Sequence, residues 1–238
     1  PMLTAIRKKL PNAFIGWAVE SPSNQLLSLH PEIDEVIVVP KSWMSKPKNW
    51  FGLARQLRSL KFDYVIDPQG ITKSAALARI SGAKTRIGIR GKWGRELSPY
   101  LNNCLIETKS PHIVDRSLEL LAAIGVRNPK AEFRLPVCSR SQQIVNRFLQ
   151  QRKITSANVV INPGASWESK RWVTDRFATV ASHLHEEFGM KSIVTWAGEE
   201  ELSMAERIVS LNPQAMVLAD KTSLGELAAL CQQARLFI

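Results

Sequence analysis

The chain has 238 residues, 45% of them hydrophobic, which is enough to bury the core of one large domain or of two small ones. Its net charge of +11 favours anionic partners, whereas three cysteines at wide spacings argue against a disulfide framework or a zinc cluster. No apolar run approaches the roughly 18 residues of a membrane-spanning helix, and the start does not resemble a signal peptide, so we expect a cytoplasmic protein.

Short apolar strands alternate with helical patterns along the chain. A helical pattern at 4–10 comes first, and later ones, with apolar residues three and four apart, cover 50–60, 177–184 and 224–231. Strands are predicted at 14–19, 36–39, 64–66, 159–161, 192–196, 216–218 and 235–238. This alternation predicts parallel sheets packed between helices, with ligands at the carboxyl ends of the strands.

The positive charge lies in the first 140 residues, which hold 22 Lys or Arg against 11 Asp or Glu, whereas the remainder holds 10 of each. Basic residues cluster beside tryptophans at 41–50 and at 84–95, and we expect 88–94 to form a mobile basic loop. Such patches attract polyanions or an acidic membrane face. For each cluster taken alone, a solvated basic surface is the alternative.

A domain boundary is predicted after Pro136. The stretch 128–136 carries two prolines and lacks periodicity, and a helical pattern begins afresh near Ser141. The charge balance changes at the same place, so two independent observations indicate one position.

A buried strand at 159–161 leads into a loop of small residues, Asn162-Pro163-Gly164-Ala165-Ser166. The N–H groups of Gly164 and Ala165 can approach phosphate oxygens closely, and Lys170 or Arg171 can neutralise charge there. An ordinary turn followed by surface charges is the alternative. The pattern is neither a Walker A loop nor a dinucleotide-binding Gly-x-Gly-x-x-Gly.

A second strand end, at 195–201, brings a glycine and three consecutive glutamates. Carboxylates accept hydrogen bonds from the paired hydroxyls of a ribose or a sugar. Acidic residues also favour the first turn of a helix whatever the function. We therefore expect one glutamate to bind ligand and the others to cap the helix.

In the first half, residues 64–70 again read as a strand that leads into a loop. The polar residues of this loop can contact an acceptor substrate. Asp67 can equally begin a turn. His112 opens a helical pattern as a substrate contact, a cap or a surface histidine. The histidine spacings, and the lack of an Asp-x-Asp sequence, predict no metal site.

Four segments follow one another in a recognisable order. They are Asp67-Pro68-Gln69-Gly70, Arg86-Ile87-Gly88, His112-Ile113-Val114-Asp115-Arg116, and 162–172 with its Pro-Gly-Ala and Lys-Arg-Trp steps. In this order, over essentially the whole chain, the sequence resembles glycosyltransferase family 9, the bacterial ADP-heptose:lipopolysaccharide heptosyltransferases, and within it heptosyltransferase I.

The resemblance implies an α/β chain with two Rossmann-like domains facing a cleft, the GT-B type, both incomplete. Residues 1–136 would form an acceptor-binding domain that lacks its first strand, and 137–238 a sugar-nucleotide-binding domain that lacks its C-terminal part. In the family, the strand and loop with the catalytic base would precede Pro1. An Asp-Thr-Gly-x-x-His segment that grips the donor would follow Ile238. We therefore expect the 238-residue polypeptide to be inactive by itself.

The implied reaction transfers heptose, with inversion, from ADP-L-glycero-D-manno-heptose to Kdo-lipid A, without a metal ion or cofactor and without nucleic acid as a partner. By analogy, Lys170 is catalytic and stabilises the departing diphosphate. The donor-binding residues implied are Ser166, Lys170, Arg171 and Glu201. The acceptor-binding residues implied are Asp67, Gln69, Gly70, Arg86, His112 and Arg116.

The basic first half fits an anionic lipid acceptor and peripheral contact with the cytoplasmic face of the inner membrane. A hypothesis from another class is a non-catalytic α/β module that binds nucleic acid or acidic lipid through this half. Steeply salt-dependent binding without any effect of an ADP-sugar would favour the second hypothesis.

Overall fold

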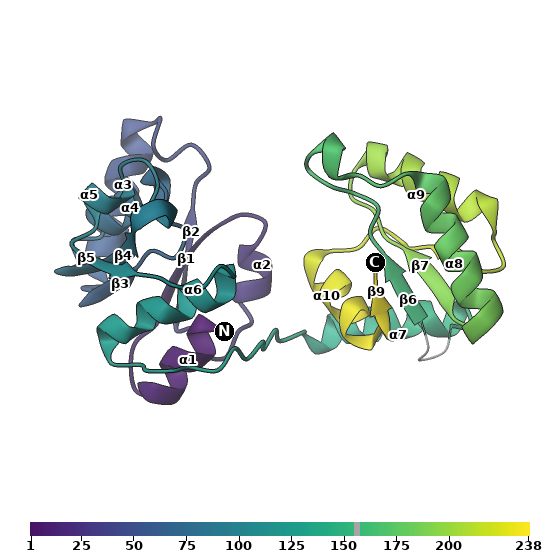
Figure 1. Cartoon of the computed structure of the whole chain (residues 1–238), viewed down its shortest axis with the longest axis horizontal. Helices are drawn as coiled ribbons and strands as arrows, with labels where there is room; N and C mark the ends of the chain where they lie inside the picture. The colour runs from purple at the N-terminus through teal and green to yellow at the C-terminus, as the bar shows by residue number, and fades with distance from the viewer. Residues whose placement is uncertain (155–157) are drawn as a thin grey trace. The chain divides into compact units, whose positions relative to one another are not determined.

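The computed structural model describes residues 1–154 and 158–238. The chain divides into two compact units, Pro1–Arg134 and Leu135–Ile238, each built from alternating helices and parallel strands (Figure 1). The division lies beside Pro136, where the sequence predicts a boundary. The acceptor and donor roles of the two parts remain predictions.

The first unit contains eleven regular elements, five strands and six helices, and two 3₁₀ turns among the described residues. The strands are β1 (Gly16–Glu20), β2 (Glu35–Val39), β3 (Tyr64–Ile66), β4 (Thr85–Arg90) and β5 (Cys104–Glu107). The helices are α1 (Met2–Lys9), α2 (Asn24–Leu27), α3 (Pro47–Ser59), α4 (Thr72–Ile80), α5 (Ser98–Leu101) and α6 (Ile113–Glu119), with the 3₁₀ turns η1 (Gly91–Trp93) and η2 (Leu120–Ile124).

The strands of this unit form two separate parallel sheets. One pairs β1 with β2, and the other has the order β3-β4-β5. A groove of about 830 Å³ is lined by both β1 and β3, with Met2 and Ile6 of α1 and Leu77 of α4 also on its wall. The unit is therefore open along one edge of each sheet.

Helices cover both faces of these sheets. Ile37 and Val39 of β2 pack with α3 and α4 around the fully buried Trp43. Elsewhere in the unit α1 packs against α6 and η2, and Ile87 and Ile89 of β4 bury against η2.

The second unit has one continuous parallel sheet. Its strands are β6 (Asn158–Ile161), β7 (Lys191–Val194), β8 (Met216–Leu218) and β9 (Leu236–Phe237), in the order β8-β7-β6-β9. Its helices are α7 (Ser139–Gln151), α8 (Thr174–Phe188), α9 (Glu199–Leu211) and α10 (Leu224–Gln233), with a 3₁₀ turn η3 (Glu168–Lys170).

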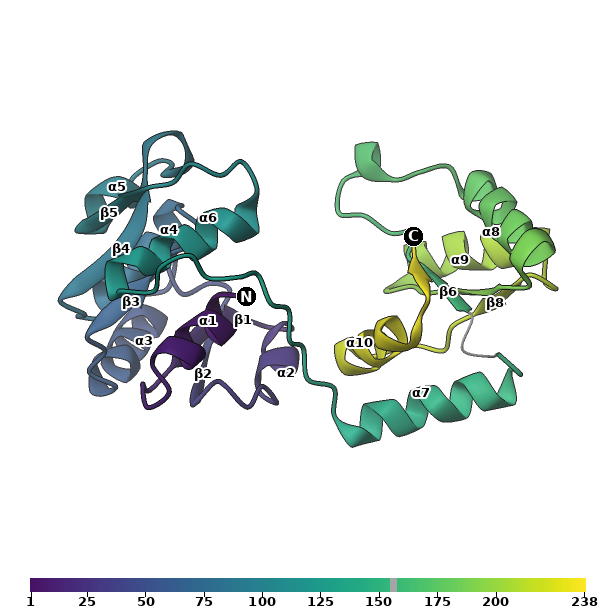
Figure 2. The ribbon, with the colours of Figure 1, turned by 60° about the horizontal axis from the view of Figure 1, so that its bottom comes forward.

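Alternate residues of β6 serve opposite faces of this sheet, as a strand buried on both sides requires. Val159 and Ile161 pack with α8 and α9, whereas Val160 packs with α7 and α10. Figure 2 shows these two pairs of helices on the two sides of the sheet. All four residues of β6 are buried, so this strand is the centre of the unit.

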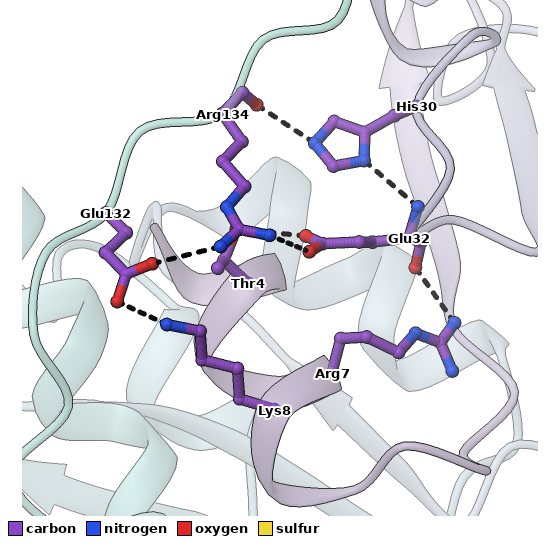
Figure 3. Close-up of polar contacts among 7 residues, drawn as sticks. All are labelled: Thr4, Arg7, Lys8, His30, Glu32, Glu132 and Arg134. Atoms are coloured by element: carbon purple, nitrogen blue, oxygen red, sulfur yellow. Dashed lines mark hydrogen bonds and ion pairs between the residues drawn. The ribbon is translucent and has the colours of Figure 1, made fainter.

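The last residues of the first unit are tied to its body by polar contacts (Figure 3). The His30 ring lies 3.0 Å from the carbonyl oxygen of Arg134, and the Arg134 guanidinium lies 3.5 Å from Glu32. Glu32 also accepts a hydrogen bond from the Thr4 hydroxyl, and Glu132 pairs with Lys8 of α1. The segment up to Arg134 is therefore fixed against α1 and the turn at His30.

The structure confirms the predicted strands within two residues at their starts and confirms the helices at 50–60, 177–184 and 224–231. The predicted mobile basic loop at 88–94 is wrong. Its first three residues complete β4, because Ile87 and Ile89 point into the core, and η1 follows directly. No helix of the described residues is long and apolar enough to cross a membrane.

Candidate functional site

In the second unit the strand order reverses at β6. The strands that follow β6 in the chain, β7 and β8, lie on one side of it in the sheet, and the last strand, β9, pairs with its other edge. In open parallel sheets, ligands bind beyond the carboxyl ends of the strands at such a reversal of strand order. This places the candidate site between the loop that follows β6 and the end of β9 at Ile238.

The loop after β6 is held at its base by Asn162. Its backbone N–H donates to the Ile238 carbonyl oxygen at 2.9 Å, which joins the loop to the end of β9. Its side chain accepts from the Thr195 hydroxyl at 3.3 Å and donates to the Gly164 carbonyl oxygen at 3.4 Å. These bonds fix the start of the loop, where the Gly164 carbonyl oxygen accepts from the Asn162 side chain.

The next three backbone N–H groups, those of Gly164, Ala165 and Ser166, have no acceptor in the part of the chain that the structure describes. Consecutive unpaired amides form the kind of concavity that binds anions. The Ser166 side chain is exposed and adds a hydroxyl donor at the same place. The geometry therefore suits the oxygens of a phosphate or diphosphate.

Lys170 supplies a cation close to these amides in the sequence. It ends η3, where its N–H donates to the Trp167 carbonyl oxygen at 2.9 Å. Its side chain is exposed, and its ammonium has no ion-pair partner among residues 1–154 and 158–238. An ammonium in this state is available to neutralise charge on a bound anion.

Arg171 is placed differently from Lys170. Its Nε donates to the Ala165 carbonyl oxygen at 3.1 Å, and its two terminal nitrogens pair with the carboxylate of Glu200, one of them at 3.2 Å. The hydrogen bond between the two side chains raises the pKa of Arg171 and lowers that of Glu200. Its guanidinium thus connects the loop to the start of α9.

The three glutamates at the start of α9 differ in their contacts. Glu201 accepts from the N–H of Ala197, just before α9, at 2.8 Å, and its carboxylate lies directly against Gly164. Glu200 pairs with Arg171, and Glu199 is exposed. The predicted ligand residue Glu201 therefore lies beside the loop, with one carboxylate oxygen already bonded to the Ala197 N–H. Its contact with a donor remains a prediction.

In the first unit, Asp67 is almost fully buried at the end of β3. One carboxylate oxygen accepts from the N–H groups of Gln69 and Gly70, both at 3.2 Å. Asp67 therefore begins a turn, which is one of the two roles that the sequence leaves open for it. The other carboxylate oxygen accepts from Ser98 at 3.3 Å and Asn102 at 3.2 Å. Asp67 thus fixes the loop, and leaves the exposed Gln69 side chain at its surface.

Gly70 and Arg116, both predicted acceptor residues, lie close to Trp93. Gly70 is buried and accepts from the Arg95 N–H at 2.8 Å, which joins the loops after β3 and β4. The Arg116 guanidinium lies 3.6 Å from the centre of the Trp93 ring and donates to the Pro111 carbonyl oxygen at 3.2 Å. The structure therefore connects the loop that holds Asp67 and Gly70, through the loop after β4, to Arg116 of α6.

Arg86 is not brought to these loops. It lies near the amino end of β4, where its guanidinium donates to the carbonyl oxygens of Leu101 at 3.0 Å and Ala83 at 2.9 Å. Burial lowers the pKa of Arg86, and repulsion from Arg79 adds to the effect. In the structure this side chain holds two turns at the opposite end of the strand from Asp67.

His112 occupies the position before α6 and is exposed, with its Nδ1 3.9 Å from Asp115. It remains free for any of the three roles that the sequence leaves open. Among the described residues, no three His, Cys, Asp or Glu side chains are grouped so as to hold a metal ion.

Comparison with known proteins places this arrangement in a family. Residues 50–238 match the sequence profile of glycosyltransferase family 9 (heptosyltransferase). The chain is 25% identical over 235 residues to the lipopolysaccharide core heptosyltransferase OpsX of Haemophilus influenzae, covering 98% of this chain and 66% of that protein.

Two solved structures share the fold. A family 9 glycosyl transferase from Veillonella parvula has a TM-score of 0.83 at 23% identity, covering 99% of this chain and 69% of that one. E. coli heptosyltransferase WaaC with ADP-2-deoxy-2-fluoro heptose has a TM-score of 0.76 at 23% identity, covering 100% and 76%. These likenesses confirm the predicted α/β fold with two Rossmann-like domains of the GT-B type, and this chain spans 69% and 76% of the two solved chains. The chain belongs to glycosyltransferase family 9, the heptosyltransferases.

Proposed function

We propose that the full-length protein transfers heptose from ADP-heptose to Kdo-lipid A in lipopolysaccharide core synthesis. The observation that carries the proposal is the row of amides at Gly164, Ala165 and Ser166, at the switch point of the second sheet, followed four residues later by Lys170; among the described residues neither these amides nor the Lys170 ammonium has a partner. Its support from relatives is the WaaC structure with an ADP-heptose analogue.

The proposed chemistry is an inverting displacement at the anomeric carbon. The acceptor hydroxyl oxygen attacks that carbon, the bond to the diphosphate oxygen breaks, and the hydroxyl proton passes to a base in the segment expected before Pro1. Negative charge grows on the departing ADP. Donors fixed before the reaction stabilise such charge most effectively. Lys170, the three amides and the Ser166 hydroxyl supply these donors without a metal ion, and Glu201 serves the ribose of the donor.

The acceptor is assigned to the first unit, which carries the excess positive charge. Its fixed loops at Asp67 and Trp93 present the exposed Gln69 and, at the start of α6, the exposed His112. A phosphorylated, Kdo-bearing lipid is strongly anionic, so a basic unit both attracts it and holds the enzyme at the cytoplasmic face of the inner membrane.

The test is a transfer assay on the full-length protein, with ADP-heptose as donor and Kdo-lipid A as acceptor. Lys170→Ala is expected to lower kcat about 100-fold to 1000-fold, the usual effect of removing one donor to a developing anion. The matched control is Lys191→Ala, which removes a lysine at the start of β7, the opposite end of the same sheet.

Wild-type activity in the Lys170→Ala variant would contradict the mechanism. No transfer by the wild type, together with salt-dependent lipid or nucleic-acid binding that ADP-heptose does not alter, would contradict the function itself. Repeating the assay with an acceptor that already carries one heptose separates transfer of the first heptose from transfer of the second.

A further inference from the structure

Arg171 and Glu200 connect two loops that both border the candidate donor site. They lie 29 residues apart, one after the β6 loop and the other in the first turn of α9. The carboxylate takes both terminal nitrogens of the guanidinium, and Nε holds the Ala165 carbonyl oxygen at 3.1 Å. A two-pronged pair of this kind fixes direction as well as distance.

The donors of Arg171 are largely engaged within the protein, by the Ala165 carbonyl oxygen and by the Glu200 carboxylate. An arginine carries five N–H donors in a rigid plane, and three different nitrogens of Arg171 already bond within the protein. Its charge is opposed by Glu200, whereas the charge of Lys170 is unopposed among the described residues. The two adjacent cations therefore differ in what they can offer an anion.

The Ala165 carbonyl is the group that matters for the shape of the loop. It belongs to the residue at the centre of the three unpaired N–H groups. Arg171 holds that carbonyl oxygen, and the bond fixes the orientation of the peptide plane between Ala165 and Ser166. A peptide unit is flat and its N–H points opposite to its C=O. The hydrogen bond from Arg171 thus aims the Ser166 N–H.

We propose that Glu200 is a positioning residue for the loop after β6, residues 162–166, and that it acts through Arg171. Glu200 holds the guanidinium, the guanidinium holds the Ala165 carbonyl, and the Ser166 amide is thereby directed at the bound diphosphate. Arg171 serves the loop rather than the ligand, and Lys170 is the cation that meets the anion. The inference rests on the proposed function, because it specifies how that site is built.

The direction in which one substitution changes the affinity for ADP distinguishes this role from simple electrostatics. Glu200→Gln removes a negative charge near an anion site, so Coulomb attraction alone predicts tighter binding of ADP. It would also release Arg171 to reach the ligand. The positioning role predicts the opposite, weaker binding by about fivefold, because a loop that is no longer fixed must be ordered when the ligand binds.

The experiment measures the ADP dissociation constant of the full-length protein by calorimetry, together with KM and kcat for the donor. Glu199→Gln is the matched control, since it removes the same charge one residue earlier from an exposed side chain. It should leave ADP binding unchanged or slightly tighter. Arg171→Lys keeps the charge but loses the planar fork, and should weaken ADP binding as much as Glu200→Gln.

The double variant Glu200→Gln/Arg171→Lys should bind ADP no more weakly than either single variant, because both act through one contact. Tighter binding in Glu200→Gln, or unchanged binding in Arg171→Lys, would overturn the proposal. Thermal unfolding of each variant verifies that the fold is intact. If the wild type does not bind ADP, the proposed function fails; if it binds and Glu200→Gln binds equally well, only the positioning role fails.

Discussion

The two units differ in how completely their strands are paired and buried. In the second, β6 has a neighbour on each side and all four of its residues are buried. In the first, β1 and β3 each have one neighbour, and none of their residues is fully buried. Edge strands of this kind present unpaired backbone groups. The difference shows that one sheet is continuous and the other is divided at its centre.

The open edges can be assigned from the pairing that exists. Ile15 and Asp67 bond toward β2 and β4 respectively. Because successive residues of a strand direct their backbone groups to opposite sides, those of Ala18 on β1 and Ile66 on β3 face the groove. The groove lies between two parallel edges and is lined by apolar side chains, which suits one more parallel strand.

The largest expected effect compares one deletion in the two sheets. Ile193 of β7 is fully buried, and Ile193→Ala should lower the free energy of unfolding of the second unit by about 4 kcal/mol. Ile66 borders the groove and is half-buried, so Ile66→Ala should cost about 2 kcal/mol or less. Native-state amide exchange reports each unit separately. Equal losses would contradict the view that the first sheet is divided.

The second prediction closes the divided sheet. A chain extended by the residues encoded before Pro1 should slow exchange of the Ala18 and Ile66 amides by at least about 100-fold, because both gain a partner strand. Amides of β7 in the second unit are the internal control and should not change. Slower exchange on only one of the two edges would show that the added segment does not lie between β1 and β3.

Much of the second sheet follows from the sequence, because strands buried on both faces are continuous apolar runs. β4 does not follow in this way, although Ile87 and Ile89 alternate correctly. Gly88 suggests a loop, whereas in the structure its missing side chain makes room for Asn102. That requirement is a contact between distant residues, and the sequence carries no local sign of it.

The candidate site, too, has one part that the sequence predicts and one part that it does not. The loop with Ser166 and Lys170 follows from a strand that ends in small residues and a cation. The partners of Asp67, Ser98 and Asn102, lie 31 and 35 residues away, and the pairing of Arg171 with Glu200 spans 29. Composition can predict that charges and turns are present, but only the fold decides which of them meet.

The smallest effect compares the glycines of the two loops. Gly70 has φ +63°, and an added Cβ would lie 2.6 Å from the backbone oxygen of Trp93, so Gly70→Ala should cost the first unit about 2 kcal/mol. At Gly164 the obstacle is the carboxylate of Glu201, a flexible side-chain end, so Gly164→Ala should cost less than about 1 kcal/mol.

The control is Gly52→Ala within α3, where no atom lies within 4 Å of the added Cβ and stability should hold or rise. Chemical denaturation of the three variants measures these costs. Gly164→Ala should nevertheless weaken ADP binding by the full-length protein, because Glu201 must leave its place against the loop. A large loss of stability at Gly164, or none at Gly70, would contradict this comparison, because an added Cβ meets the backbone at Gly70 but meets at Gly164 a side chain that a ligand can rearrange.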